Sequence, residues 1–173
     1  PALIDGPTGR TLSYRGWAEA VRRAAAGLST RGFRKGDVFA IYSPNLPEYA
    51  IAFHAVSLLG GIVTTINPLY TVAELRHQLE DAGARALVTV PTFLDKAAHA
   101  ARDAGVREVF VFGEANGAPP FASLLTTADE PPAVAIDPRT QVVALPYSSG
   151  TTGLPKGVML THHNLVSNAL VSG

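Results

Sequence analysis

The amino-acid sequence predicts an α/β fold in which helices cover both faces of a mainly parallel β-sheet. Short apolar segments alternate with segments of helical periodicity along most of the chain, and this alternation is typical of such a sheet. Apolar residues make up 47% of the 173 residues and charged residues 16%, which is enough for a hydrophobic core and too apolar for a disordered chain. A chain of this length is expected to form one domain or at most two.

The N-terminal residues predict two short strands followed by a helix. Residues 2–5 and 11–14 have strand character and are joined by turn-forming residues. Ser13 is placed to cap the helix, and Gly32 is expected to end it. The apolar residues at helical spacing that define its buried face are Trp17, Val21, Ala24, Ala25 and Leu28.

The next segment predicts a buried helix between two buried strands. Residues 38–42 form the first strand and residues 62–66 the second. Pro44 and Pro47 are expected to start the helix, because proline is tolerated in a first helical turn. Residues 50–66 are the most apolar stretch, but two adjacent glycines interrupt it, and a membrane-spanning helix needs about 20 continuous apolar residues. No membrane span is therefore predicted.

Two further strand–helix units follow. The spacing of Thr71 and Glu74 is that of a capping box, which predicts a helix that continues through Leu79. Beyond it the pattern predicts strands at 86–90 and 109–112 with a helix at 92–104 between them.

The last third of the chain begins with a segment of different composition. Residues 113–139 are rich in Gly, Pro and Ala, and we expect them to form an irregular surface excursion. Residues 142–147 form an apolar strand that leads into a glycine-rich loop, and residues 158–160 look extended. Thr161 is placed to cap a final helix.

Charge and composition exclude several classes of function. Fourteen basic and fourteen acidic side chains cancel, so no nucleic-acid partner is expected and any bound anion must be held by a local site. The chain has no cysteine, which excludes disulfides and thiolate metal sites. His162 and His163 are adjacent on a predicted helix and point apart, so no metal site is predicted. The absence of a signal-peptide pattern favours a cytoplasmic protein, and oligomerisation stays open.

The glycine-rich loop concentrates the groups that a polyphosphate needs. Gly150, Gly153 and Gly157 allow backbone to approach an anion closely and to adopt positive φ, and successive N–H groups in such a turn can form a concave anion site. Lys156 adds a mobile positive charge, the one catalytic group that the sequence offers. The hydroxyl donors of the loop are Ser148, Ser149, Thr151 and Thr152.

Two other interpretations of this loop are weaker. In the P-loop pattern G-x-x-x-x-G-K-[ST] the lysine follows a glycine, whereas Lys156 precedes Gly157 and no Ser or Thr follows it. A plain surface turn also uses Gly, Ser, Thr and Pro. The ten-residue run stands directly after an apolar strand, however, and this placement favours a binding loop.

Residues 147–162, YSSGTTGLPKGVMLTH, resemble the signature of the acyl-adenylate-forming superfamily. This superfamily includes acyl- and aryl-CoA ligases, adenylation domains of peptide synthetases and firefly-type luciferases. Similarity extends over most of the chain, through Leu12-Ser13-Tyr14, SPNLPEY at 43–49, LLGG at 58–61 and NPLYT at 67–71. These segments are most similar to the CoA-ligase branch and to 4-coumarate–CoA ligase-like proteins. The excursion at 113–139 carries no family pattern.

The resemblance implies an enzyme that activates a carboxylic acid, aryl or fatty, in two steps. ATP and the acid give an acyl-adenylate, and CoA then gives the thioester. Mg²⁺ is the expected counter-ion of ATP. The residues that match the family loop in contact with the ATP phosphates are Ser148, Ser149, Gly150, Thr151, Thr152 and Lys156, with Gly153 and Gly157 as shaping glycines.

The resemblance also implies that residues 1–173 are the N-terminal portion of a larger adenylate-forming domain, in a longer protein called the parent below. Family motifs for the acyl pocket, for ribose and for the lysine of the small C-terminal domain have no counterpart here. We therefore expect this chain alone to be inactive. The alternatives are a stand-alone nucleotide-binding or interaction module, and an adenylation domain that loads a carrier protein.

Overall fold

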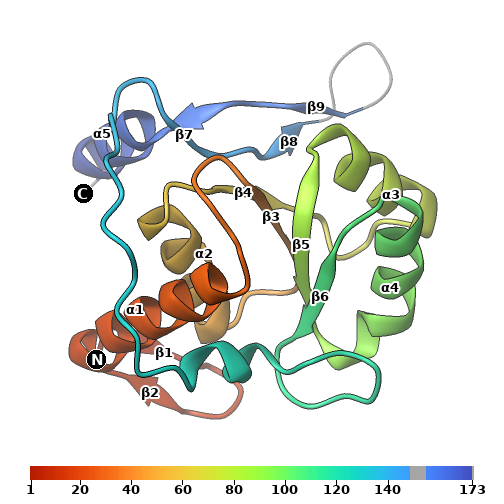
Figure 1. The fold of residues 1–173 in the computed structure, drawn as a ribbon, viewed down its shortest axis with the longest axis horizontal. Helices are drawn as coiled ribbons and strands as arrows, with labels where there is room; N and C mark the ends of the chain where they lie inside the picture. Colours follow the sequence, from red (N-terminus) through yellow and green to blue (C-terminus); the bar gives the residue numbers. More distant parts are fainter. Residues whose placement is uncertain (149–154, 173) are drawn as a thin grey trace.

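The structure is a computed structural model that describes residues 1–148 and 155–172. Its centre is a six-stranded sheet with the strand order β10-β7-β4-β3-β5-β6 (Figure 1). All neighbouring pairs are parallel except β10 and β7. The strands are β3 (Val38–Tyr42), β4 (Ile62–Thr65), β5 (Ala84–Thr89), β6 (Glu108–Val111), β7 (Val142–Ala144) and β10 (Leu160–Thr161). The predicted mainly parallel sheet is confirmed.

Helices cover both faces of the sheet, as the sequence predicted (Figure 1). One face packs against α1 (Tyr14–Thr30) and α2 (Pro47–Leu58), and the other against α3 (Val72–Asp81) and α4 (Leu94–Asp103). Strand β3 shows why two layers form. Phe39 and Ile41 point into the first layer while Ala40 and Tyr42 point into the second, because side chains alternate along a strand. None of the helices in the described residues is long and apolar enough to cross a membrane.

Local capping groups start α1 and α3 where the sequence indicated. The backbone N–H of Gly16 donates to the side chain of Ser13 at 3.1 Å. Thr71 and Glu74 form both bonds of a capping box on α3. The short ribbon of β1 (Leu3–Ile4) and β2 (Thr11–Leu12) precedes α1, and α5 (His162–Ser172) closes the chain.

Several element boundaries differ from the prediction, and two of the differences have a clear physical reason. Helix α2 begins at Pro47 rather than at Pro44, because the chain is still extended at Leu46. The strand expected at 142–147 is two elements, β7 and the separate β8 (Tyr147–Ser148). The interruption lies at Pro146, which has no N–H with which to continue the ladder between β7 and β4.

The segment at 113–139 is more ordered than predicted. It contains a 3₁₀ helix, η2 (Phe121–Leu125), and the side chains of Phe121 and Leu124 are each 1% exposed. They belong to the core between α1, α2 and the sheet. Farther along, Lys35 Nζ donates to the carbonyl oxygen of Ala135 at 2.6 Å. The irregular excursion is therefore attached to the domain along its length.

Candidate functional site

The glycine-rich loop leaves and re-enters a small two-stranded ribbon. Strand β8 pairs with β9 (Lys156–Gly157) in antiparallel register, with Tyr147 opposite Gly157 and Ser148 opposite Lys156. Figure 1 shows this hairpin above the sheet, beside α3. Because the sheet is parallel at β7, the hairpin follows the carboxyl end of a strand, the edge at which open α/β sheets bind ligands.

Three of the eight predicted phosphate-loop residues lie in the described part of the chain. Ser148, Lys156 and Gly157 are all exposed at the base of the hairpin. The cross-strand pairing brings the hydroxyl-bearing Ser148 and the ammonium-bearing Lys156 to opposite positions of one ribbon. The other predicted residues, Ser149, Gly150, Thr151, Thr152 and Gly153, lie outside the described residues.

Gly157 is closely packed against side chains and does not use the positive φ that glycine allows. It is absent from the glycines that have positive φ in the described chain, contrary to the prediction. A Cβ atom at this position would lie 3.1 Å from Cδ1 of Leu145 and 3.3 Å from Cε2 of Tyr147. A larger residue would push against the strand that carries the loop.

Buried hydrogen bonds hold the chain just before the hairpin. The hydroxyl of Thr64 on β4 donates to the carbonyl oxygen of Leu145 at 2.8 Å. The side-chain amide of Gln78 on α3 donates to that hydroxyl at 2.8 Å and to the carbonyl oxygen of Thr65 at 3.1 Å. Helix α3, strand β4 and the entrance to the hairpin are thereby joined.

A second contact with α3 lies at the surface. The phenol of Tyr147 on β8 donates a hydrogen bond to the carboxylate of Asp81 at the end of α3. Burial raises the pKa of Tyr147 above its ordinary value, and the hydrogen bond and negative charge of Asp81 raise it further. The phenol therefore keeps its proton and remains a donor at neutral pH.

A small apolar pocket of about 160 Å³ separates the hairpin from α3. Its lining residues are Tyr70, Ala73, Glu74, His77, Gln78, Tyr147 and Pro155. Pro155 precedes β9 and Tyr147 lies on β8, so both arms of the hairpin form part of its wall.

The two histidines after β10 do not form a metal centre with other described residues. Burial lowers the pKa of His162, so its imidazole is neutral at pH 7, and its Nε2 atom is buried. His163 is exposed. Nowhere in residues 1–148 and 155–172 do three His, Cys, Asp or Glu side chains gather as a metal site would require.

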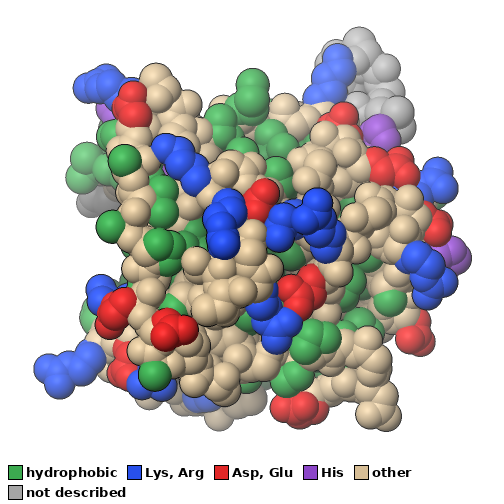
Figure 2. Space-filling model, viewed as in Figure 1, with side chains coloured by type: hydrophobic (Ala, Val, Ile, Leu, Met, Phe, Trp, Pro, Cys, Tyr) green, Lys and Arg blue, Asp and Glu red, His purple; other side chains and the backbone are tan. Residues whose placement is uncertain are grey.

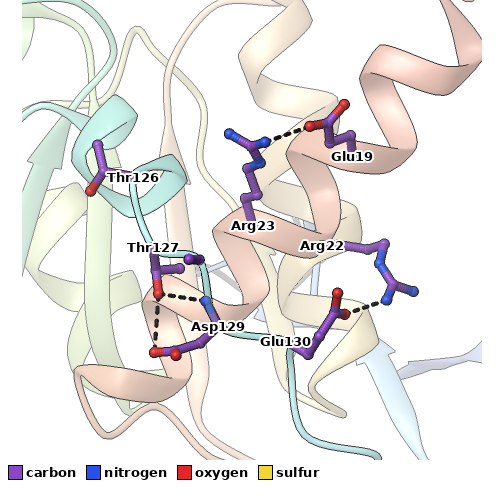
Figure 3. Close-up of a pocket in the computed structure, with 8 residues that line it drawn as sticks. Glu19, Arg22, Arg23, Thr126, Thr127, Asp129 and Glu130 are labelled. Carbon is purple, nitrogen blue, oxygen red and sulfur yellow. Dashed lines mark hydrogen bonds and ion pairs between the residues drawn. The ribbon is translucent and has the colours of Figure 1, made fainter.

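A larger cavity of about 390 Å³ lies between α1 and residues 126–130 (Figure 3). Its arginines are already paired: Arg23 contacts Glu19 at 2.6 Å, and Arg22 contacts Glu130. None of the described hairpin residues lines it. Acidic and basic side chains are also interspersed over the molecular face in Figure 2, in keeping with the zero net charge. The hairpin remains the candidate site.

Sequence reasoning missed Thr64, Gln78 and the partner of Tyr147. That partner is Asp81, whose carboxylate accepts the tyrosine phenol. Gln78 left a readable signal. It lies between Leu75 and Leu79 on the buried face of α3, where a polar side chain must find a hydrogen-bond partner.

Known proteins resemble this chain over nearly its whole length. A protein-family model described as AMP-binding enzyme matches residues 1–172. The 4-coumarate–CoA ligase 3 of Oryza sativa subsp. japonica is 47% identical over 168 residues, which cover 97% of this chain and 30% of the relative. The 4-coumarate–CoA ligase of Pinus taeda is 46% identical over 174 residues, with 97% and 31% covered. The chain thus spans about a third of the length of these relatives.

Solved structures share the same arrangement. A long-chain-fatty-acid-CoA ligase (FadD1) from Archaeoglobus fulgidus superposes with a TM-score of 0.85 at 31% identity, covering 98% of this chain and 34% of that one. The anthranilate CoA ligase AuaEII, solved in complex with anthranoyl-AMP, gives a TM-score of 0.85 at 25% identity, with 94% and 32% covered.

Proposed function

The chain belongs to the AMP-binding enzyme family, and from this premise we propose that it is the N-terminal third of an ATP-dependent acid–CoA ligase. One observation carries the proposal. The loop sequence typical of adenylate-forming enzymes stands on a hairpin at the carboxyl end of a parallel strand, with Lys156 and Ser148 paired at its base. The substrates are a carboxylic acid, ATP and CoA.

The proposed reaction proceeds in two displacements. A carboxylate oxygen of the acid attacks the α-phosphorus of ATP, and the bond to the departing pyrophosphate breaks. The sulfur of CoA then attacks the acyl carbon, and AMP leaves as the thioester forms. Both curated relatives named above are 4-coumarate–CoA ligases, which supports an aryl acid over a fatty acid as the substrate class.

Each loop residue has a role in the first displacement. Backbone N–H groups and the hydroxyls of Ser148, Ser149, Thr151 and Thr152 donate to phosphate oxygens. The ammonium group of Lys156 is exposed at the base of the hairpin and offsets the charge that builds up on the leaving pyrophosphate. Its flexible stem allows that charge to follow the phosphates as they separate.

The expected counter-ion of ATP, Mg²⁺, would be carried mainly by the nucleotide. Mg²⁺ is usually held by one or two carboxylates together with substrate phosphates and water. The described hairpin strands contain no carboxylate. We therefore assign Mg²⁺ to the ATP phosphates.

The proposal is tested in the parent by ATP–pyrophosphate exchange and thioester formation with a panel of aryl and fatty acids. We expect exchange with at least one acid, and we expect Lys156→Met to lower kcat/KM for ATP about 10²-fold, the cost of removing one charge-stabilising donor. Lys156→Arg should retain part of the activity.

Lys35→Met is the matched control. Lys35 donates to a backbone carbonyl far along the chain and lines no pocket with the hairpin. Its substitution should leave exchange within about twofold of the unchanged protein. A parent that exchanges with none of the acids, or one in which both lysine variants lose activity equally, contradicts the proposal.

A further inference from the structure

Two almost completely buried side chains connect α3 to the hairpin by hydrogen bonds. Gln78 is 2% exposed and Thr64 is 0% exposed. Burying an amide and a hydroxyl costs free energy unless their hydrogen bonds are made. The amide oxygen of Gln78 has no partner among the described residues, but its NH₂ group and the hydroxyl of Thr64 both donate. Here the donors are used in sequence, from Gln78 to Thr64 and from Thr64 to the carbonyl oxygen of Leu145.

The last of these hydrogen bonds ends at Leu145, where backbone pairing between β7 and β4 stops. The N–H of Leu145 donates to the carbonyl oxygen of Val63 at 2.8 Å, which is the last backbone bond from β7 to β4. Pro146 follows and has no N–H to offer. The hydroxyl of Thr64 bonds the carbonyl oxygen of Leu145 at this point, so a side chain takes over where backbone pairing ends.

The hairpin begins immediately after this bond. The N–H of Val158 donates to the carbonyl oxygen of Pro146 at 2.8 Å and closes the base of the hairpin next to Leu145. Gly157 packs against the side chain of the same Leu145. A shift of Leu145 would therefore displace both strands of the hairpin.

We propose that Thr64 and Gln78 are positioning residues for the phosphate-binding hairpin, because they fix the residue from which it departs. The surface bond between Tyr147 and Asp81 adds a second hold on the same helix. Neither buried side chain touches the nucleotide. Both act through the backbone at Leu145. The consequence for ATP binding rests on the proposed function, whereas the control of the hairpin base does not.

The experiment compares two buried threonines. Thr89 is also 0% exposed and donates to a backbone carbonyl, that of Tyr42, at 2.9 Å, but on β5 and away from the hairpin. Thr64→Val and Thr89→Val remove the same kind of bond and keep the side-chain volume. Thr64→Ser restores the hydroxyl, and Gln78→Leu removes the first donor.

Amide hydrogen exchange of the 173-residue chain reads the hairpin base directly. We expect the Val158 amide to exchange about 2- to 10-fold faster in Thr64→Val and Gln78→Leu, the range that corresponds to one lost hydrogen bond. It should stay unchanged in Thr89→Val and return in Thr64→Ser. Equal acceleration in the two valine variants, or none in Thr64→Val, overturns the proposal.

Steady-state kinetics of the parent measure the consequence for ATP binding. We expect Thr64→Val to raise KM for ATP about 2- to 10-fold with little change in KM for the acid, and Thr64→Ser to restore it. If the parent is active and Thr64→Val leaves its KM for ATP unchanged, the proposed effect of Thr64 on ATP binding is overturned. A parent without any exchange activity overturns the proposed ligase instead, while the exchange rate of Val158 still decides the positioning role.

Discussion

Gly27 shows how much depends on one missing methyl group. It lies in the last turn of α1, and a glycine within a helix ordinarily weakens it. A Cβ atom here would lie 2.3 Å from the carbonyl oxygen of Leu124 and 2.8 Å from its Cα. The glycine therefore lets the backbone of η2 lie directly on α1, which is how residues 113–139 gain their anchor in the core.

Gly27→Ala is expected to destabilise the chain. Alanine in place of glycine in an open helix would stabilise it by about 1 kcal/mol. Against that, the clash with backbone that cannot move aside costs about 3 kcal/mol, at the upper end of overpacking. The net loss of about 2 kcal/mol is measured by urea unfolding of the 173-residue chain.

Gly16→Ala is the control within the same helix. A Cβ atom at Gly16 would lie 3.3 Å from Cδ1 of Leu12 and 3.4 Å from the hydroxyl of Ser13, both side-chain atoms that can adjust. Its stability should equal or slightly exceed that of the unchanged chain. If Gly27→Ala is as stable as Gly16→Ala, the close approach of η2 is wrong.

At the scale of elements, α3 begins with a capping box whose strength depends on pH. The pKa of Glu74 is lowered, first by the hydrogen bond from the backbone of Thr71 and then by the hydroxyl of Thr71. A lowered pKa in the folded chain stabilises it fully above the ordinary value of about 4.5. That stabilisation is lost as pH falls from there through the lowered pKa.

Glu74→Gln should therefore change the pH dependence of stability more than the stability at neutral pH. Glutamine also serves in a capping box, so both bonds with Thr71 are retained without the charge. We expect the unfolding free energy of the unchanged chain to fall more steeply than that of Glu74→Gln as the pH is lowered below the ordinary glutamate value of about 4.5. Parallel curves over this range would show that the capping carboxylate contributes nothing through its charge.

The elements also show which parts of the fold were predictable. Caps are local, so Ser13 and the pair Thr71 and Glu74 identified their helices from sequence alone. The anchoring of η2 depends on Gly27, which lies about a hundred residues earlier in the chain. No local pattern could indicate that contact.

The candidate site likewise has a part that the local sequence predicted and a part that it did not. The residue types of the loop predicted Ser148, Lys156 and Gly157 as phosphate-binding residues, because phosphate binding demands hydroxyls, a cation and glycines together. The structure places these three residues on one ribbon. The supports of the loop were missed because Thr64 and Gln78 lie on other elements and contact it only after folding. That the loop residues bind phosphate stays a prediction for all of them.

At the scale of the whole molecule, this chain holds only part of the proposed reaction. It spans about a third of the length of the curated ligases it resembles. We expect the purified 173-residue chain to show no ATP–pyrophosphate exchange with any acid that the parent uses. Robust exchange by this chain would overturn that expectation.

The reading frame of the gene separates the remaining alternatives. A frame that continues beyond residue 173 into the missing motifs supports the ligase, and a carrier module farther on supports an adenylation domain instead. A stop codon after residue 173 supports a stand-alone nucleotide-binding module.

The pairing of β10 with β7 fixes both ends of the segment that carries the glycine-rich loop. The chain leaves the sheet at Ala144 and returns at Leu160, directly opposite the point of departure. The pairing of these two residues therefore holds the ends of the segment together, while Leu145 and Tyr147 inside it also bond to β4 and α3. A change in the length of the glycine-rich loop is therefore expected to leave the strand order of the sheet unchanged.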